Sequence, residues 1–516
     1  GLGDVYKRQG CDTAYKYDIT DGIDNNGASE PDITIDTEGG IDVSMYEKAR
    51  IFPGLVDTAK EERINATIEL DLNKQYIDSI TLGVSKVPQP IYSTGLYAGA
   101  GEQVAITVED NTMGLSVIVG SHMDDLTELA PYQRMPLVYV AKALFPGKNI
   151  IKNPLGGPIW IKKSLGLKAS GTCSLKIEGV YKSPDFVIGE TDLQDWKRRI
   201  SETTVPWLEI RGKHFAFTVQ KDRVLDNLES ISSTLQEVGK EWDEAIEEFF
   251  FEYYGLKIDK DAEEKERAPE FPFRVVLDVQ VLGNLYLRNS DYAIVAINNT
   301  YMLEEMLNLR TLRIGNSVAL LSAINSMCTY RSRNNPWPAD YRTVANAIPL
   351  YRIGKKNFSK ENAFGEIFPG EENITTLFPK AIEYAMADSS KWAKEDAATK
   401  YDDKTAYKAF DLLSLIQLAN YDDNNWEAMK YLNLKAKEER SIDNSTLSYA
   451  FRMLCDYFKQ NLCPFFDYWG VEQLDEDRKY AEQYPLMDKK IWEYNPLNPQ
   501  PVSYTHLRAH ETAANL

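Results

Sequence analysis

Histidine is scarce in this sequence, and histidines are the first residues to consider for acid–base or metal chemistry. The chain has four: His122 and His214 lie in its body, and His506 and His510 lie near its end. His122 is followed by two acids in the stretch GSHMDDL, so it could form an acid–base pair or be a satisfied surface or core histidine. His214, in GKHFAF, is expected in a strand, with the same two alternatives.

The stretch GNSVALLSAINSM, residues 315–327, has no ionisable side chain and predicts an apolar core helix. No histidine occurs between His214 and His506, so a zinc-binding His-Glu-x-x-His motif is absent from that span. Two acidic segments, Glu304-Glu305 and EEFFFEYYG at 247–255, are expected to be solvated helix faces. The chain has no G-x-S-x-G, P-loop or dinucleotide motif, whereas glycosidase-type carboxylate pairs stay open in a chain this acidic.

Composition indicates a folded protein and limits the classes of binding partner to be expected. The 516 residues are 43% hydrophobic and 26% charged, which is typical of a chain with a large buried core. The formal net charge is -20, so phosphate backbones and anionic membrane surfaces are poor partners and nucleic-acid binding is not expected. No run of about 18 apolar residues exists, so no membrane-spanning helix is predicted.

The two ends of the chain require separate treatment. Residues 1–9, GLGDVYKRQ, and residues 501–516, PVSYTHLRAHETAANL, look like translated sequencing-adapter read-through from an assembled fragment and are set aside. Gly10-Cys11 then opens a polar, acidic stretch at 10–42, which resembles the lipid-attached start and flexible linker of a bacterial lipoprotein. We therefore expect lipid attachment at Cys11 and export to the outer membrane or cell surface, with a fortuitous cysteine as the alternative.

The remaining cysteines are widely spaced and show no C-x-x-C pattern, which excludes a zinc ribbon or a dithiol redox motif. They are Cys173, Cys328, Cys455 and Cys463. Cys455 and Cys463 could pair in an oxidising compartment, but burial as small hydrophobic residues is the preferred interpretation.

Hydrophobic periodicity divides the chain into a β-rich and an α-rich half. Residues 43 to about 220 alternate with period two in several places, and the runs 104–108 and 115–119, separated by EDNTMG, predict a hairpin within a β-sandwich. Apolar residues then recur at helical spacing from Asp226, a candidate N-cap, to Gly255, a candidate C-cap. We expect an α+β fold.

Three folded regions are expected within that α+β fold. They are a β-rich N-terminal domain at 43–220, a core at 221–360 with a small β element at 273–297, and a C-terminal helical subdomain at 361–500.

Six blocks of the sequence, in one order, resemble the enhancin-like, mucin-targeting zinc metallopeptidases of peptidase family M-sixty. The blocks are STGLYAGAGEQVAITV (93–108), Arg134-Met135-Pro136, NPLGGPIWI (153–161), PWLEIRGKHFAFTV (206–219), PEFPFRVVLDVQ (269–280) and NLCPFFDYWGV (461–471). The resemblance spans roughly residues 45 to 475 and implies a gluzincin-like peptidase core at 221–360.

The resemblance also implies a zinc site. In this family one helix carries His-Glu-x-x-His, whose histidines bind Zn²⁺ and whose glutamate acts as general base, and an acidic third ligand lies downstream. The stretch 315–327 falls where that helix belongs, and Asn346 with Tyr351 matches the family's downstream Asn-x-x-x-x-Tyr.

The residues at the implied zinc positions are not metal ligands. Alignment on Asn325 puts Leu320, Leu321 and Ile324 at the ligand, base and second-ligand positions, and alignment on Gly315 puts Val318, Ala319 and Ser322 there. The third-ligand position falls near Arg342, whose permanent charge repels a dication. We therefore expect a degenerate member without zinc or catalytic residues, because apolar side chains at these positions can pack whereas an empty ligand cluster would need solvation.

The expected function is binding of glycoprotein or O-glycosylated peptide in the family's cleft, a ligand class that comes from the resemblance alone. Trp337, close to the former site, could stack on a sugar ring, or it could be a core residue. Asn325, Asn346 and Tyr351 complete the expected cleft. Two alternatives stay open: an active metallopeptidase or other glycoprotein hydrolase with relocated catalytic residues, and a scaffold that docks proteins without recognising glycans.

Overall fold

The computed structural model describes residues 52–109, 111–129, 131–167, 170–314, 319–357, 413–419 and 426–495. Contacts between residues group the chain into two compact units, each drawn from separate stretches of sequence. The first unit takes the described residues that fall within 52–76, 88–240 and 269–307, and the second takes those that fall within 77–87, 241–268 and 308–495. None of the helices in these ranges is long and apolar enough to span a membrane. The domain boundaries expected at residues 220 and 360 stay predictions.

The first unit begins with a β-sandwich. Its strands are β1 (Ile64–Asp71), β2 (Ile91–Ala98), β3 (Gln103–Val108), β4 (Leu115–Val119), β5 (Val140–Leu144), β6 (Gly147–Lys152), β7 (Gly157–Lys163) and β8 (Thr172–Lys182). They follow the order β5-β4-β7-β2-β8-β3-β6, with β1 also paired to β8. The long strand β8 pairs with β1 along most of its length, with β3 over residues 175–178 and with β2 at its end, so it joins the two layers. Inward residues such as Ile106, Val117 and Ile177 fill the space between the layers.

The hairpin expected at 104–119 is wrong, although both of its strands exist. Strand β3 pairs with β6 and β8, whereas β4 pairs with β5 and β7. The segment between them therefore crosses from one layer to the other, with Gly114 at φ 87°. Alternation of buried residues showed correctly that each strand has one face in the core. It does not show whether two strands are neighbours in one layer, because strands in opposite layers also face the same core.

A second, six-stranded sheet completes the first unit. Its strands are β9 (Phe186–Val187), β10 (Trp207–Arg211), β11 (Phe215–Gln220), β12 (Phe273–Asp278), β13 (Leu287–Asn289) and β14 (Ile294–Ile297). The order is β13-β14-β12-β11-β10-β9, so β13 is an edge strand, antiparallel to β14. Every residue of the central strand β12 is buried, as expected for a strand covered on both faces.

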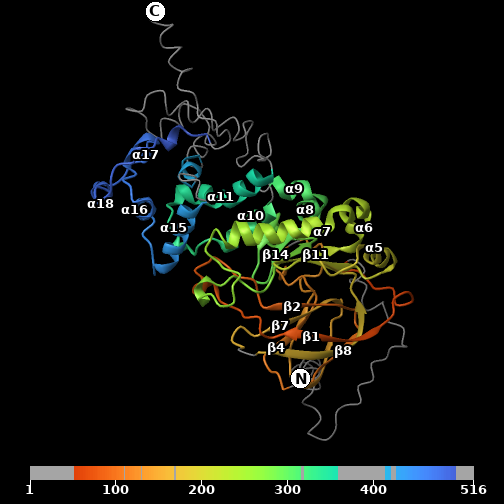
Figure 1. Cartoon of the computed structure of the whole chain (residues 1–516). Helices are drawn as coiled ribbons and strands as arrows, with labels where there is room; N and C mark the ends of the chain where they lie inside the picture. Colours follow the sequence, from red (N-terminus) through yellow and green to blue (C-terminus); the bar gives the residue numbers. More distant parts are fainter. Residues whose placement is uncertain are drawn as a thin grey trace, which may run out of the picture. The chain divides into compact units, whose positions relative to one another are not determined.

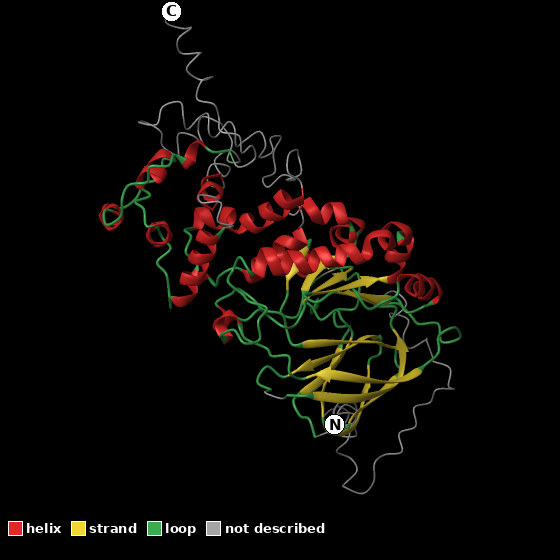
Figure 2. Ribbon diagram, viewed as in Figure 1, coloured by secondary structure: helices red, strands yellow, loops and turns green. Residues whose placement is uncertain are grey.

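Both faces of the second sheet are covered within the first unit. One face packs on the sandwich through Trp160, Val276 and Val295. Over the other face lie the helices α5 (Leu193–Glu202), α6 (Lys221–Asp226) and the first part of α7 (Leu228–Glu244) (Figures 1 and 2). Gly239 of α7 permits this close approach, because a Cβ at that position would lie 2.2 Å from the side chain of Ile188. The short helices η3 (Leu282–Asn284) and α8 (Thr300–Leu307) also belong to this unit.

A long helix between Asp226 and Gly255 is confirmed, but Asp226 is not its N-cap. Helix α6 ends at Asp226, α7 follows from Leu228, and the π-helical segment η1 (Ala245–Phe251) continues it. Segment η1 ends at Phe251, and a turn follows to Gly255, whose φ of 67° is the left-handed conformation that favours glycine after a helix.

The second unit is mainly helical. Its elements are α4 (Ser79–Leu82), η2 (Glu264–Glu266), α9 (Leu309–Ile314), α10 (Ala319–Cys328), η4 (Ser332–Asn334), α11 (Ala339–Asn357), α15 (Glu427–Glu438), α16 (Ser448–Phe458), α17 (Cys463–Tyr468), α18 (Asp475–Ala481) and η5 (Ile491–Glu493). Helices α10 and α11 and the segment η1 pack against one another. An α+β fold with a sheet-rich first half and a helical second half is thus confirmed.

The four cysteines within the described residues are free and buried, and Cys455 and Cys463 do not form a disulfide. The expected lipid-attachment residue Cys11, the terminal segments 1–9 and 501–516, and His506 with His510 lie outside the described residues.

Candidate functional site

Helix α10 occupies the stretch in which the resemblance places a catalytic helix. Leu320, Leu321 and Ile324 are all 0% exposed, which makes them fully packed core residues. The expected apolar core helix is thus present over Ala319–Cys328, while residues 315–318 lie outside the described part of the chain. The aliphatic side chains at these three inward positions stabilise this helix by burial instead of offering ligands.

Polar contacts join α10 to α11. The side-chain amide of Asn325 donates a hydrogen bond of 2.7 Å to the backbone oxygen of Asn346. Nε of Arg342 donates to the backbone oxygen of Trp337 at 3.1 Å, so this guanidinium caps the chain just before α11. The backbone of Asn346 therefore takes part in the contact between α10 and α11, and Arg342, matched to the family's third ligand, is bonded to the chain just before its own helix.

The two aromatic residues of the expected ligand cleft lie in the core. Trp337 is 2% exposed and stacks on Tyr341, with ring centroids 6.2 Å apart. Tyr351 is 0% exposed and meets the ring of Trp426 edge-on at 6.1 Å. Stacking of Trp337 on a sugar does not fit these burial values, because the ring face is already covered by a neighbouring ring, and the core-packing alternative describes it better.

The donors near α10 do not fit a zinc ion. Zinc takes imidazole, thiolate or carboxylate ligands, usually four in tetrahedral geometry. The helix itself offers only Cys328, and burial raises the pKa of this thiol well above its ordinary value, which disfavours the thiolate that a metal needs. In the described ranges no three or more His, Cys, Asp or Glu residues gather closely enough to hold a metal ion.

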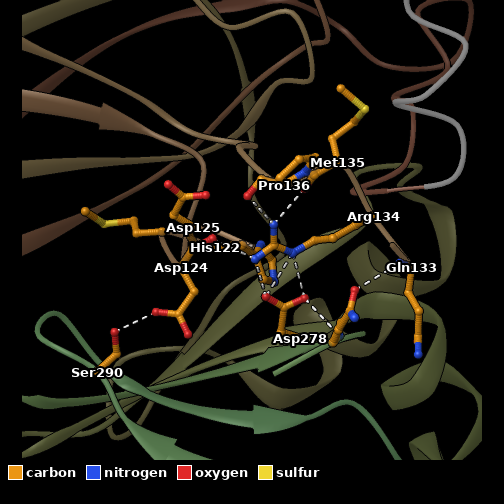
Figure 3. Close-up of polar contacts among 12 residues, drawn as sticks. His122, Asp124, Asp125, Gln133, Arg134, Met135, Pro136, Asp278 and Ser290 are labelled. Carbon is orange, nitrogen blue, oxygen red and sulfur yellow. Dashed lines mark hydrogen bonds and ion pairs between the residues drawn. The ribbon is translucent and has the colours of Figure 1, made fainter. Parts of the chain in front are cut away.

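A second polar cluster lies in the first unit, around His122 (Figure 3). The His122 ring is 2% exposed and sits between Phe52 and Trp207, each with its ring centroid 4.6 Å away. Nε2 lies 2.9 Å from the backbone oxygen of Leu277, so this nitrogen carries the proton and donates it. Of the two open interpretations of His122, the satisfied core histidine fits these contacts.

Arg134, part of the resemblance to the peptidase family, forms a buried ion pair with Asp278 beside this histidine (Figure 3). Nε lies 3.0 Å from both carboxylate oxygens and a terminal nitrogen lies 2.8 Å from one of them. The remaining donors reach the backbone oxygens of Asp124, Met135 and Pro136. Both side chains are 0% exposed, and the pair ties the loop before β5 to the end of β12.

Asp124, two residues after His122, is bonded to other side chains. Asp124 accepts a 2.6 Å hydrogen bond from the Ser290 hydroxyl and pairs with Arg288 at 3.0 Å (Figure 3). The alternative of an acid–base pair between His122 and a following acid is not supported, because Asp124 bonds to Ser290 and Arg288, and Asp125 accepts from the Thr127 amide.

Burial of His122 predicts a dependence of stability on pH. Removal from water lowers the pKa of His122 to about 4, with Arg134 adding to the decrease and Asp278 and Asp124 opposing it. An unfolded histidine titrates near 6.5, so its stabilising contribution is complete above that value and is lost as the pH falls toward 4. The loss corresponds to about 3 kcal/mol of unfolding free energy.

His122→Gln tests that dependence, because an amide can donate to Leu277 but does not titrate. Urea denaturation at pH 7 and pH 4 should show a smaller pH-dependent loss in this variant than in the unmodified chain. Equal losses would contradict the assignment to His122.

Two other expectations about ionisable residues are wrong. His214 lies in the turn between β10 and β11, where the Gly212 amide donates to the Phe215 oxygen, and not in a strand. Glu305 is 0% exposed, whereas its neighbour Glu304 is solvated as expected. The Glu305 carboxylate accepts a hydrogen bond from the hydroxyl of Tyr301 on the same helix.

Two contacts between residues were not predicted from the sequence. Asp278 ends a run of apolar strand residues, which is a signal of a buried charge, but its partner Arg134 lies 144 residues earlier. Tyr286 and Tyr301 form an exposed aromatic pair, and no local pattern connects them.

Comparison with known proteins places this fold in one family. Residues 61–177 match the N-terminal domain of M60-like peptidases, and residues 179–314 match Peptidase M60, enhancin and enhancin-like. Human TRPM8 channel-associated factor 2 is 27% identical over 195 residues, which are 37% of this chain and 19% of that protein. The match thus spans about a fifth of that relative's length.

Solved structures share the fold at low sequence identity. The ZmpB metallopeptidase from Clostridium perfringens superposes with a TM-score of 0.62 at 18% identity, covering 83% of this chain and 82% of that one. The catalytic domain of ZmpC from the same organism, in complex with the sialyl T antigen, gives 0.61 at 16% identity over 83% and 82%. These structures show the shared fold, and the family matches over residues 61–177 and 179–314 show that this chain belongs to the enhancin-like peptidase family.

Proposed function

We propose that this chain is a catalytically inactive homologue of the enhancin-like metallopeptidases that binds glycoprotein or O-glycosylated peptide without cutting it. The observation that carries the proposal is the buried aliphatic set Leu320, Leu321 and Ile324 on α10. A zinc hydrolase needs a metal to polarise the substrate and to generate a nucleophile from water, and these side chains supply no ligand and no base.

The chemistry of the surrounding residues supports the loss of zinc. No histidine lies between His214 and His506, and Arg342 brings a positive charge to the position matched with the third ligand. The match to the peptidase domain ends at residue 314, directly before this region. A cluster of zinc ligands without its metal would be costly to bury. Replacement of these ligands and the general base by packed residues is therefore consistent with a loss of catalysis.

The ligand class in this proposal rests on the structural relatives. Two of them were solved with glycan antigens bound, the ZmpC catalytic domain with the sialyl T antigen and another metallopeptidase with the Tn antigen. Likeness at 16% and 14% identity shows the fold alone, so glycan recognition by this chain is part of the proposal.

Display at a bacterial surface through a lipid on Cys11 also belongs to the proposal. It is supported by Gly10-Cys11 and the acidic stretch that follows. Metabolic labelling with a palmitate analogue should mark the protein but not its Cys11→Ala variant.

A binding assay with a cleavage readout tests the proposed function. A peptide carrying one N-acetylgalactosamine on threonine, and the same peptide without the sugar, are titrated against the purified chain with zinc or with EDTA. We expect saturable binding of the glycopeptide that EDTA does not change, weaker binding of the bare peptide, and intact peptides by mass spectrometry. Chelator-sensitive cleavage would contradict inactivity and favour a hydrolase with relocated ligands.

Protein docking without glycan recognition is the second candidate. The curated relatives are named for association with a channel, and that name supports a docking role for the shared domain. Equal affinity for the two peptides would favour this candidate over glycan recognition.

A further inference from the structure

An exposed pair of tyrosines lies where β13 and α8 begin in the first unit. Tyr286 directly precedes β13 and Tyr301 lies in the first turn of α8, with their ring centroids 5.9 Å apart and their planes inclined at 51°. The side chains are 45% and 49% exposed, and Leu285 beside them is 51% exposed. Because apolar surface left in water costs about 25 cal/mol per Å² relative to burial, two adjoining exposed rings indicate a surface that a ligand can cover.

The backbone and the hydroxyl of Tyr286 hold its ring in place. Its backbone oxygen accepts a 3.0 Å hydrogen bond from Ile297. Its hydroxyl oxygen lies 3.4 Å from the side-chain amide of Asn299, and the Asn299 carbonyl oxygen accepts from Met302 at 2.8 Å at the start of α8. The partner of the Tyr286 hydroxyl is thus itself fixed as a helix cap.

A buried acid holds Tyr301. Its hydroxyl donates to the Glu305 carboxylate, one helical turn along α8, and that carboxylate is 0% exposed. Burial and the Glu305 carboxylate raise the pKa of Tyr301 to about 12, so the hydroxyl stays protonated in the neutral pH range. Two rings held by hydrogen bonds lose little conformational freedom when a ligand binds, which favours affinity.

The groups around the rings indicate the class of ligand. A pyranose presents an apolar C–H face that covers an aromatic ring and a rim of hydroxyls that bond to phenol and amide groups. Arg288, the basic residue of β13, is already paired with Asp124 at 3.0 Å, so the strand offers no uncommitted cation for an anionic sugar. The chemistry therefore suits a neutral sugar.

We infer that Tyr286 and Tyr301 form a platform for a neutral hexopyranose, with Asn299 bonding to its hydroxyl rim. The inference rests on the proposed function for the source of the sugar, an O-linked glycan, and it assigns that glycan to named residues. Edge strand β13 and helix α8 supply the rigid frame on which the rings stand.

Titration with methyl glycosides of galactose and N-acetylgalactosamine, followed by saturation-transfer NMR, tests the platform on the full chain. Tyr286→Ala and Tyr301→Ala should each weaken sugar binding by about tenfold, since each removes one stacking face. Tyr132→Ala is the matched control, because Tyr132 is 51% exposed in the same unit and its hydroxyl donates to the Thr127 oxygen in the same loop. Its affinity should equal that of the unmodified chain.

Loss of folding is distinguished from loss of the site by conservative variants. Tyr286→Phe and Tyr301→Phe keep the rings and remove the hydroxyls, so we expect far-ultraviolet circular dichroism to be unchanged and sugar affinity to decrease by less than in the alanine variants. Absence of saturable sugar binding by the unmodified chain, or equal binding by the folded alanine variants, would overturn the platform.

The glycopeptide assay separates this inference from the proposed function. If glycopeptide binding persists unchanged in both alanine variants, the platform is wrong and the proposed function stands. If free sugars bind in a tyrosine-dependent manner but the glycopeptide does not bind, the platform stands and the proposed function fails.

Discussion

Replacement of Asp278 by alanine is expected to lower the free energy of unfolding by about 3–5 kcal/mol. Asp278 is the only carboxylate bonded to the buried Arg134 guanidinium among the contacts of the described residues, and both side chains are 0% exposed. Its removal would leave a positive charge in the protein interior without a counter-charge. Urea denaturation followed by tryptophan fluorescence should show this as a lower midpoint.

Two comparisons separate the buried charge from general effects of substitution. Glu202→Ala removes an exposed partner of Arg198 on α5 and should change the midpoint little, because water screens that pair. The double variant Arg134→Met with Asp278→Leu should be more stable than Asp278→Ala, since it removes both charges together. A loss below about 1 kcal/mol in Asp278→Ala would contradict the described geometry.

Leu321→Ala should cost about 2–5 kcal/mol, because truncation of a fully buried leucine leaves a cavity that neighbours only partly fill. Leu321 is 0% exposed and matches the general-base position of the related peptidases in the alignment on Asn325. A large loss would show that packing has replaced chemistry at this position. Thermal and urea unfolding provide the measurement.

Ser322→Ala is the matched control, because Ser322 is the next residue on α10 and is exposed. Alanine also has the higher helix propensity, so this variant should keep or slightly raise stability. Equal losses in the two variants would indicate that α10 as a whole is perturbed, whereas no loss in Leu321→Ala would contradict the core position.

Much of the fold could be predicted because hydrophobic periodicity reports which face of an element is buried. Strands β3 and β4 and the helix after Asp226 were found in this way. Their partners were not, because a buried face does not specify which strand lies beside it. The failed hairpin at 104–119 follows from this, since β3 and β4 face the same core from opposite layers.

For single ionisable residues, too, the local sequence does not specify what the side chain faces in the fold. Glu304 and Glu305 look alike in sequence, yet successive helical residues point about 100° apart, so one faces water and the other the core. Gly212 already marked a turn before His214, and the strand assignment overlooked that signal.

Some features of the candidate site are visible in the local sequence, and others depend on contacts between distant residues. The absence of ligands on α10 could be read from Leu320, Leu321 and Ile324 alone, given the resemblance. The burial of Trp337 under Tyr341 could not, because an aromatic residue has the same local signature in a core and in a binding site. The pair Tyr286 and Tyr301 depends on how β13 meets α8, which only the fold provides.

The metal content of the purified chain shows whether a zinc site is present. The full chain, exposed to excess zinc and then desalted, is analysed by inductively coupled plasma mass spectrometry beside an active enzyme of the family as a positive control. We expect no stoichiometric zinc in the chain, because α10 and α11 present aliphatic side chains and Arg342 where ligands would be required. About one zinc per chain, together with glycopeptide cleavage that EDTA abolishes, would contradict this expectation.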